Sequence, residues 1–503
     1  MKIKSVKFNF IMNFILTASN FIFPLITFPY VSRVLGASGT GKVSFAISVV
    51  SYFTMVAALG VPTYGIRAAA KARDDQEKLN RTTQEILIIH LFIHLFNKIS
   101  KKPQIKKKGV KMMYEEYIMA ILFVPRFQSD RILFLVVGVS ILLDPLGVNW
   151  LYQGLEQYGY IAKRSIFLKF VGVILMFMFI HSPDDYVFYG VTSILASAGS
   201  NVLNFINLRK YVSLKPVGDY NIKQHLKPIL ILFAQVVAVN IYTNLDNVML
   251  GFMKTDLDVG LYAAAVKVKT ILTSLVTSLG AVLLPRLSYY IMEGRKEEFQ
   301  ALIKKAYNFV IVIAFPLMLF TIFYAKDCLI CLSGNEFIGA TLAMQIIAPT
   351  IVLIGLSNLL GIQVLTPLNR EKQLVYSVVA GAVADLILNM VFIPEMGAAG
   401  AALGTLVAEA VVLMVQILYL KDLFFKIAKQ VQYGKIVLAL ILASVISIRC
   451  SNIVDMVFLK LLIAGMSFFG IYGLILLLTK ENFINSYVLE GILKNKVFHR
   501  KGK

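Results

Sequence analysis

The chain has 503 residues, of which 58% are hydrophobic and only 16% are charged, and its mean hydropathy is +0.74. A soluble domain carries roughly a quarter charged residues, so this composition excludes an ordinary water-soluble protein. The formal net charge of +22 does not indicate a nucleic-acid partner, because the basic residues are spread through many short loops and form no nucleic-acid motif.

Apolar runs recur from one end of the sequence to the other. A helix needs about twenty apolar residues to cross the hydrocarbon core of a bilayer. The predicted spans lie near residues 8–28, 43–61, 131–151, 165–180, 186–206, 228–251, 260–284, 306–324, 341–366, 373–393, 400–420, 436–448 and 457–479. With one further crossing between 86 and 125, they predict an all-α polytopic membrane protein of about fourteen transmembrane helices.

The segment between 86 and 125 is the least membrane-like part of this pattern. Two short apolar pieces flank seven lysines that lie between Lys98 and Lys111. Each lysine would cost several kcal/mol at bilayer depth, and neither apolar piece is long enough to cross alone. A basic lipid-binding loop is one interpretation. The interpretation we favour is a frameshifted or inactive copy, in which the third helix is disrupted around 92–118.

Lysine and arginine are unevenly distributed between the predicted loops. With the N-terminus inside, the cytoplasmic segments carry 33 of these residues and the external segments carry 7. Because short cytoplasmic loops are enriched in Lys and Arg, we expect a multi-pass protein of the cytoplasmic membrane with both termini in the cytoplasm.

Two stretches of the sequence resemble each other. Leu35-Gly36 and Leu59-Gly60 in the first stretch match Leu250-Gly251 and Leu279-Gly280 in the second. Six spans separate the copies, so we expect two parallel six-helix halves with a substrate path between them. The predicted parts are an N-terminal half over 1–210, a cytoplasmic linker over 211–227, a second half over 228–425, and two extra helices with a basic tail over 426–503.

Several predicted spans carry polar side chains on one face, at a spacing of three to four residues. For single Ser, Thr or Asn residues, hydrogen bonding between helices is the favoured interpretation. Ionisable residues at membrane depth face a wet cavity or a partner, and for these a functional role and a buried structural pair are about equally favoured. The ionisable residues that we select from the polar stripes and their neighbours are Asp246, Lys267, Asp385 and Glu409.

No catalytic, nucleotide-binding or metal-binding motif accompanies the polar stripes. Cys328 and Cys331 form a C-x-x-C without a second pair or a nearby histidine, which is insufficient for a metal site. The sequence contains no P-loop and no acyl- or phosphoryl-transfer signature. We therefore expect a protein that is not an enzyme, with no metal or organic cofactor.

Three stretches resemble one known family. Pro24–Ala46, which includes Tyr30–Gly36, and Trp150–Glu156 resemble the Wzx-type polysaccharide flippases. Asp385–Glu409 is similar to the same family and to its multidrug-exporting relatives in the multidrug/oligosaccharidyl-lipid/polysaccharide exporter superfamily. The resemblance implies a V-shaped, MATE-like bundle of two six-helix halves, with two additional C-terminal helices here.

The resemblance also implies a substrate, an oligosaccharide on a polyprenyl pyrophosphate carrier that is moved to the outer leaflet for capsule, O-antigen or teichoic acid assembly. Cationic groups make the strong contacts to phosphate, so Lys267 and Arg33 are the candidates for the pyrophosphate. The candidates for the glycan are Asn13, Asn20, Asn240 and Asn244. The candidates for coupling to H⁺ or Na⁺ are Asp246, Asp385 and Glu409.

The expected partners are the lipid-linked oligosaccharide and membrane lipids, with a polysaccharide polymerase as a further candidate. A multidrug/cation antiporter of the same fold is the nearest alternative function. A membrane polysaccharide polymerase or ligase is less favoured, because the clear external loops contain at most about sixteen residues, too few to hold a catalytic loop.

Overall fold

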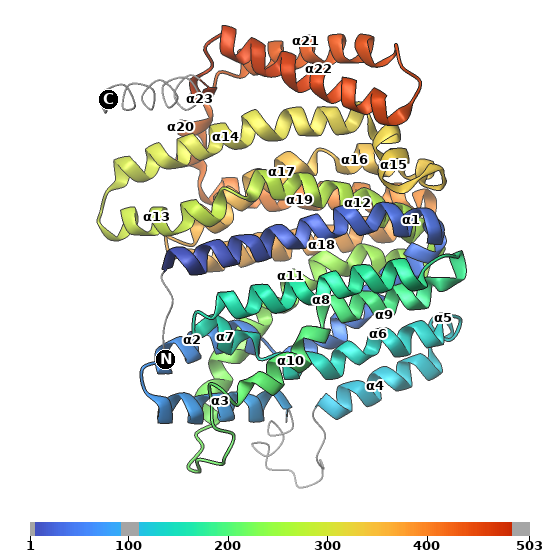
Figure 1. Ribbon diagram of the computed structural model, residues 1–503. Coiled ribbons are helices and arrows are strands. Elements are labelled where there is room, and N and C mark those ends of the chain that lie inside the picture. Colours follow the sequence, from blue (N-terminus) through green and yellow to red (C-terminus); the bar gives the residue numbers. More distant parts are fainter. Residues whose placement is uncertain (1–5, 92–109, 485–503) are drawn as a thin grey trace, which may run out of the picture. The chain divides into compact units, whose positions relative to one another are not determined.

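The structure is a computed structural model, and it describes residues 6–91 and 110–484. These residues form helices and connecting turns, and no β-strand occurs among them, so the predicted all-α class is confirmed. They divide into two compact units, Met1–Gly260 and Leu261–Lys503. Figure 1 follows the chain from α1 in blue to α22 in red.

The first unit is built around one very long helix. Its elements are α1 (Val6–Ala58), α2 (Val61–Ala72), α3 (Gln76–Leu91), α4 (Val110–Phe123), α5 (Pro125–Gln128), α6 (Arg131–Leu143), η2 (Asp144–Gly147), α7 (Asn149–Gly154), α8 (Tyr158–Phe179), η3 (Pro183–Asp185), α9 (Tyr186–Ser197), α10 (Gly199–Leu208) and α11 (Lys223–Met253). α1 packs against α8, α11 and α6, and α2 packs against α7 and α3. α1 is therefore packed against three helices that follow it at different places in the sequence.

α1 contains the predicted span 8–28 and most of the predicted span 43–61. Its helical segments meet at Gly36, where φ is 67° and ψ is −177°. A left-handed φ is readily adopted only by glycine, so Gly36 permits a kink where the sequence predicts a short loop.

The second unit places its two C-terminal helices on a common apolar core. Its elements are α12 (Asp256–Thr277), which begins within the first unit, α13 (Gly280–Met292), α14 (Lys296–Phe323), α15 (Ala325–Ser333), η4 (Asn335–Ala340), α16 (Thr341–Ile347), α17 (Thr350–Asn358), the π-helical η5 (Leu359–Leu365), α18 (Glu371–Met396), α19 (Ala398–Tyr419), α20 (Lys421–Ala428), α21 (Tyr433–Ser451), α22 (Val457–Leu478) and α23 (Asn482–Ile484). Tyr472 of α22 donates a hydrogen bond to the Val312 carbonyl of α14 at 2.9 Å. Phe468 of α22 packs beside Phe320 of α14. The C-terminal helices are thus integral to this unit.

Most of the apolar helices have membrane-spanning dimensions. Within the described residues, eight helical runs are long and apolar enough to cross a bilayer, and a ninth arises if Asn335–Ile347 and Thr350–Leu365, bent by 46°, form one span. The polytopic membrane fold is confirmed, whereas the figure of about fourteen helices stays a prediction.

The disturbed third span is only partly described. The lysines from Lys98 to Lys108 lie outside the described residues, between the end of α3 and the start of α4. α4 packs against α6 and α1, and its fully buried Tyr117 donates a hydrogen bond to the Phe134 carbonyl at 2.5 Å. The C-terminal piece of the disturbed region is therefore part of the packed unit.

Candidate functional site

The polar stripe of α1 meets a lysine from α8. Lys169 donates hydrogen bonds to Ser19 Oγ at 2.9 Å and to Asn20 Oδ1. Its Nζ atom also lies 5.9 Å from the centroid of the Phe23 ring. The predicted glycan residue Asn20 is therefore paired with a cation that the sequence analysis did not select.

The other selected residues of α1 lie apart from this pair. Asn13 is exposed, and it stands two helical turns before Asn20. Arg33 is exposed beyond Pro29, and its Nη1 donates to the Pro29 carbonyl at 2.7 Å. Within α1, the structure does not bring Arg33 to the Asn20–Lys169 pair.

The predicted glycan residues of α11 form a short ladder along their own helix. Asn244 Nδ2 donates to the Asn240 carbonyl at 3.2 Å and to Thr243 Oγ1 at 3.1 Å. Asn240 also lines a cavity of about 190 Å³, together with Thr63 and three apolar residues of α11. Since a water molecule occupies about 30 Å³, this cavity has room for several waters beside the Asn240 amide. Asp246 is buried two residues farther along the helix from Asn244.

The predicted coupling residues of the second unit lie in its closest helix interface. Asp385 of α18 and Glu409 of α19 are buried, with exposed fractions of 1% and 7%. A Cβ atom at Gly404 would lie 2.2 Å from Asn389 Oδ1 and 3.2 Å from Asp385 Oδ1. Gly404 therefore lets α19 approach the face of α18 that carries Asp385. Lys267 belongs to α12.

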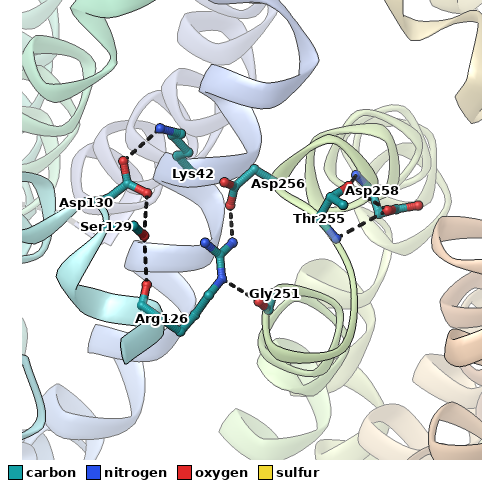
Figure 2. Close-up of polar contacts among 8 residues, drawn as sticks. All are labelled: Lys42, Arg126, Ser129, Asp130, Gly251, Thr255, Asp256 and Asp258. Atoms are coloured by element: carbon teal, nitrogen blue, oxygen red, sulfur yellow. Dashed lines mark hydrogen bonds and ion pairs between the residues drawn. The ribbon is translucent and has the colours of Figure 1, made fainter. Parts of the chain in front are cut away.

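A network of charged residues lies at one end of the first unit (Figure 2). Lys42 of α1 pairs with Asp130 at 2.8 Å. Arg126 pairs with Asp256 and donates from Nε to the Gly251 carbonyl at 2.7 Å. The turn around 125–131 is thereby connected both to α1 and to the start of α12.

The backbones beside this network approach each other very closely. A Cβ atom at Gly41 would lie 1.8 Å from the Asp256 carbonyl oxygen, and one at Gly260 would lie 1.8 Å from the Ala37 oxygen. Only glycine fits such a contact. Gly41 and Gly260 follow Gly36 and Gly251, which are landmarks of the predicted internal repeat.

The Trp150–Glu156 motif and the preceding Asn149 contact several neighbouring helices of the first unit. Asn149 Oδ1, at the start of α7, accepts hydrogen bonds from Arg164 at 2.6 Å and from Asn204 at 2.9 Å. Glu156 pairs with Arg73 at 2.7 Å, and the buried Trp150 ring packs on Gly65 of α2. The motif thus connects α7 to α2, α8 and α10.

A second polar pocket lies between α2, α3 and the start of α11. The buried Glu85 accepts hydrogen bonds from the Asn221 backbone N–H at 2.6 Å and forms a 2.7 Å contact with His225. Tyr64 contacts the other ring nitrogen of His225 at 2.6 Å. The pocket measures about 550 Å³ and also contains Lys71, Lys78 and Arg81. This cluster attaches the predicted linker 211–227 to α3.

Sequence reasoning missed Lys169, Glu85 and His225 for different reasons. Lys169 lies within the predicted span 165–180, but it is close to Lys163 and Arg164 at the start of that span and was therefore grouped with the adjoining basic loop. Glu85 and His225 are 140 residues apart, and a single sequence carries no signal for such a pairing.

Among the described residues, no group of three or more His, Cys, Asp and Glu side chains could hold a metal ion. Cys328, Cys331 and Cys450, all among the described residues, form no disulfide bond.

Comparisons with known proteins point to one family. Residues 6–291 match the family described as "Polysaccharide biosynthesis protein". A protein of Escherichia coli K12 named "Putative O-antigen transporter" is 24% identical over 426 residues, covering 83% of this chain and 97% of that protein. A protein of Haloferax volcanii named "Probable low-salt glycan biosynthesis flippase Agl15" is 23% identical over 259 residues, covering 51% of this chain and 50% of that protein.

Solved structures share the fold. The lipid II flippase MurJ in an inward closed conformation has a TM-score of 0.69 at 14% identity, covering 92% of this chain and 98% of that chain. An inward-facing multidrug resistance MATE transporter has a TM-score of 0.58 at 13% identity, covering 81% of this chain and 95% of that chain. At these identities the likeness shows the fold alone, and it confirms the predicted MATE-like class.

Proposed function

We propose that this chain, which belongs to the polysaccharide biosynthesis protein family, is a flippase for a lipid-linked oligosaccharide. The observation that carries the proposal is the family match over 6–291, supported by relatives named as an O-antigen transporter and a glycan flippase. The substrate would be turned from the inner to the outer leaflet during assembly of a capsule, O-antigen or teichoic acid.

The polar helices have the chemistry that this cargo requires. A glycan needs hydrogen-bond donors and acceptors in place of water, and the amides of Asn13, Asn20, Asn240 and Asn244 would supply them. The polyprenyl tail can remain in lipid, because it is as apolar as the bilayer interior. Lys267 and Arg33 are the proposed contacts of the pyrophosphate, since charge-assisted hydrogen bonds to phosphate are the strong ones.

Transport would proceed by alternating access between the two repeat halves. Asp246, Asp385 and Glu409 are the proposed sites of H⁺ or Na⁺ coupling, because ionisable groups at membrane depth commonly serve ion pathways. The charge count of the loops supports a cytoplasmic membrane location with both termini inside. A polysaccharide polymerase in the same membrane is the proposed recipient of the exported unit.

The function is tested by complementation of a deletion strain that lacks the corresponding flippase. We expect the wild-type chain to restore surface glycan, and Lys267→Ala to reduce it by at least about tenfold, the factor that corresponds to one lost charge-assisted contact. Lys269→Ala is the matched control, because Lys269 lies about 200° around the helix from Lys267.

Two results would count against this proposal. Failure of the wild-type chain to restore any glycan, while it exports cationic drugs from cells, would favour the multidrug/cation antiporter. Equal glycan export by the Lys267→Ala and Lys269→Ala variants would remove Lys267 from the pyrophosphate site.

A further inference from the structure

Lys169 stands at the middle of α8, in apolar surroundings. It is the twelfth residue of the 22-residue helix Tyr158–Phe179, so it lies about 16 Å from the start of the helix at 1.5 Å per residue. Phe167 and Phe170 on either side are 60% and 58% exposed, as lipid-facing side chains would be. Lys169 itself is half-buried against α1.

The contacts of Lys169 leave its positive charge uncompensated. Its hydrogen-bond partners are the neutral oxygens of Ser19 and Asn20, and no acidic side chain in the described part of the first unit pairs with it. A charged lysine at this depth is costly and marks a functional site by default. The network at the end of the unit, by contrast, gives both Lys42 and Arg126 an acidic partner.

The hydrogen bonds of Lys169, Ser19 and Asn20 indicate which kind of ligand this site would bind. The single hydroxyl hydrogen of Ser19 is donated to the Leu16 carbonyl at 2.6 Å, so Ser19 Oγ can only accept from Lys169. Lysine has three donors and no acceptor, which requires that Asn20 turns its oxygen toward it. The third Lys169 N–H and the Asn20 amide N–H groups remain as donors. The site therefore offers donors and positive charge, a combination that suits an oxyanion.

We propose that Lys169, held by Ser19 and Asn20, is a binding subsite for the diphosphate group of the substrate. The assignment to the diphosphate of a lipid-linked oligosaccharide rests on the proposed function, whereas the oxyanion chemistry rests on these contacts alone. Asn20 then positions the lysine and donates to the ligand, rather than serving the glycan alone.

The test uses the full chain in nanodiscs of phosphatidylcholine, with farnesyl pyrophosphate as the probe and farnesol as the uncharged comparison. We expect wild-type protein to bind farnesyl pyrophosphate and not farnesol. Lys169→Gln should weaken the binding about 10- to 100-fold, as one charge-assisted hydrogen bond would. Lys163→Gln is the matched control, because it removes the same charge from an exposed position on the same helix and should leave the affinity unchanged.

A second variant separates ligand binding from a structural role. Asn20→Asp would give Lys169 an acidic partner, which keeps or strengthens the attachment of α8 to α1. An oxyanion subsite predicts that Asn20→Asp loses the affinity for farnesyl pyrophosphate while the thermal unfolding temperature is kept. A purely structural tie predicts that the affinity is kept, and that result would overturn the proposal.

Two further outcomes also decide the question. Equal affinities of the Lys169→Gln and Lys163→Gln variants would overturn the subsite. Phosphatidylglycerol in the nanodiscs is the competing phosphate source, and displacement of the probe by it at equal concentration would assign the subsite to bulk lipid headgroups. Failure of glycan export by the wild-type chain would contradict the proposed function, whereas the measured affinities for farnesyl pyrophosphate would still decide whether the oxyanion subsite exists.

Discussion

At Gly404 the interface between α18 and α19 leaves no room for a side chain. The side-chain amide oxygen of Asn389 occupies the space in which a Cβ atom would stand, and a carboxylate oxygen of Asp385 lies close beside it. Both residues are at most 1% exposed, so they have no free space into which they could withdraw. Asp385, which we propose for ion coupling, therefore packs closely against Gly404 of the facing helix, because glycine has no side chain.

We expect Gly404→Ala to destabilise the protein by about 1–3 kcal/mol, the usual effect of an added methyl in a packed interface. Thermal unfolding in detergent measures the change. Gly473→Ala is the control, because Gly473 on α22 has no atom within 4 Å of its would-be Cβ. Alanine is also the better helix former, so that variant should be unchanged or slightly stabilised. Equal unfolding temperatures for the two variants would contradict the packing argument.

The residues of the candidate site were only partly readable from the sequence. Asn20 and Asn240 were selected as candidates because polar residues at helical spacing are conspicuous within an apolar run. Lys169 was missed because it lies near other basic residues, and a cluster of basic residues is typical of a cytoplasmic loop. Only the structure shows that its helix begins well before it, at Tyr158. The hydrogen bond from Arg164 to Asn149, beside the Trp150–Glu156 motif, joins two helices in three dimensions, and a linear pattern does not encode such a contact.

Among the elements, the turn around 125–131 and the start of α12 depend on each other through the pair Arg126–Asp256. Arg126 and Asp256 retain side-chain exposures of 25% and 16%, so solvent screens their attraction in part. The same turn also holds Lys42 through Asp130. Ion pairs at this end of the unit thus connect three segments that are far apart in the sequence.

A double-mutant cycle tests this connection. Arg126→Gln and Asp256→Asn should each lower the free energy of unfolding by about 1 kcal/mol, and the double variant should lose little more than either single one. Asp258→Asn supplies the control, because Asp258 bonds to Thr255 and not to Arg126. Its effect should add to that of Arg126→Gln, and strict additivity in both cycles would mean that the Arg126–Asp256 pair contributes nothing.

The breaks within helices were the least predictable features of the elements. Hydropathy reports how apolar a run is, but it does not report where the backbone departs from the α-helix. The sequence therefore shows 186–206 as one span, whereas the chain breaks between α9 and α10 at Ala198. It likewise gives no sign of the π-helical turns of Leu359–Leu365. Such breaks depend on tertiary contacts rather than on local composition.

For the whole molecule, the predicted crossing between 86 and 125 determines on which side of the membrane every later loop lies. The family match runs through this segment, and the charge count of the later loops requires a crossing. If the crossing is absent, every loop beyond residue 125 changes sides. The side on which the later loops lie, compared with that of a loop before the segment, therefore shows whether the crossing exists.

Cysteine labelling from outside the cell distinguishes these cases. Cys328, Cys331 and Cys450 are first replaced by serine, and single cysteines are then placed at the exposed positions Ser38, Lys215 and Asn452. We expect a membrane-impermeant maleimide to label Ser38→Cys and Asn452→Cys in intact cells, and Lys215→Cys only after lysis. Labelling of Ser38→Cys together with Lys215→Cys, but not of Asn452→Cys, would show that the crossing is missing.

The uncompensated charge of Lys169 has an electrical consequence. A charge within the bilayer experiences the transmembrane voltage, at about 2.3 kcal/mol per elementary charge for a full 100 mV drop. In an inside-negative cell, this field drives an anion outward and holds a cation inward. A diphosphate bound at Lys169 forms a pair with reduced net charge, so loading the site and emptying it would each displace charge. The turnover of this transporter should therefore be measurable as a small capacitive current in a planar membrane, without any coupling ion.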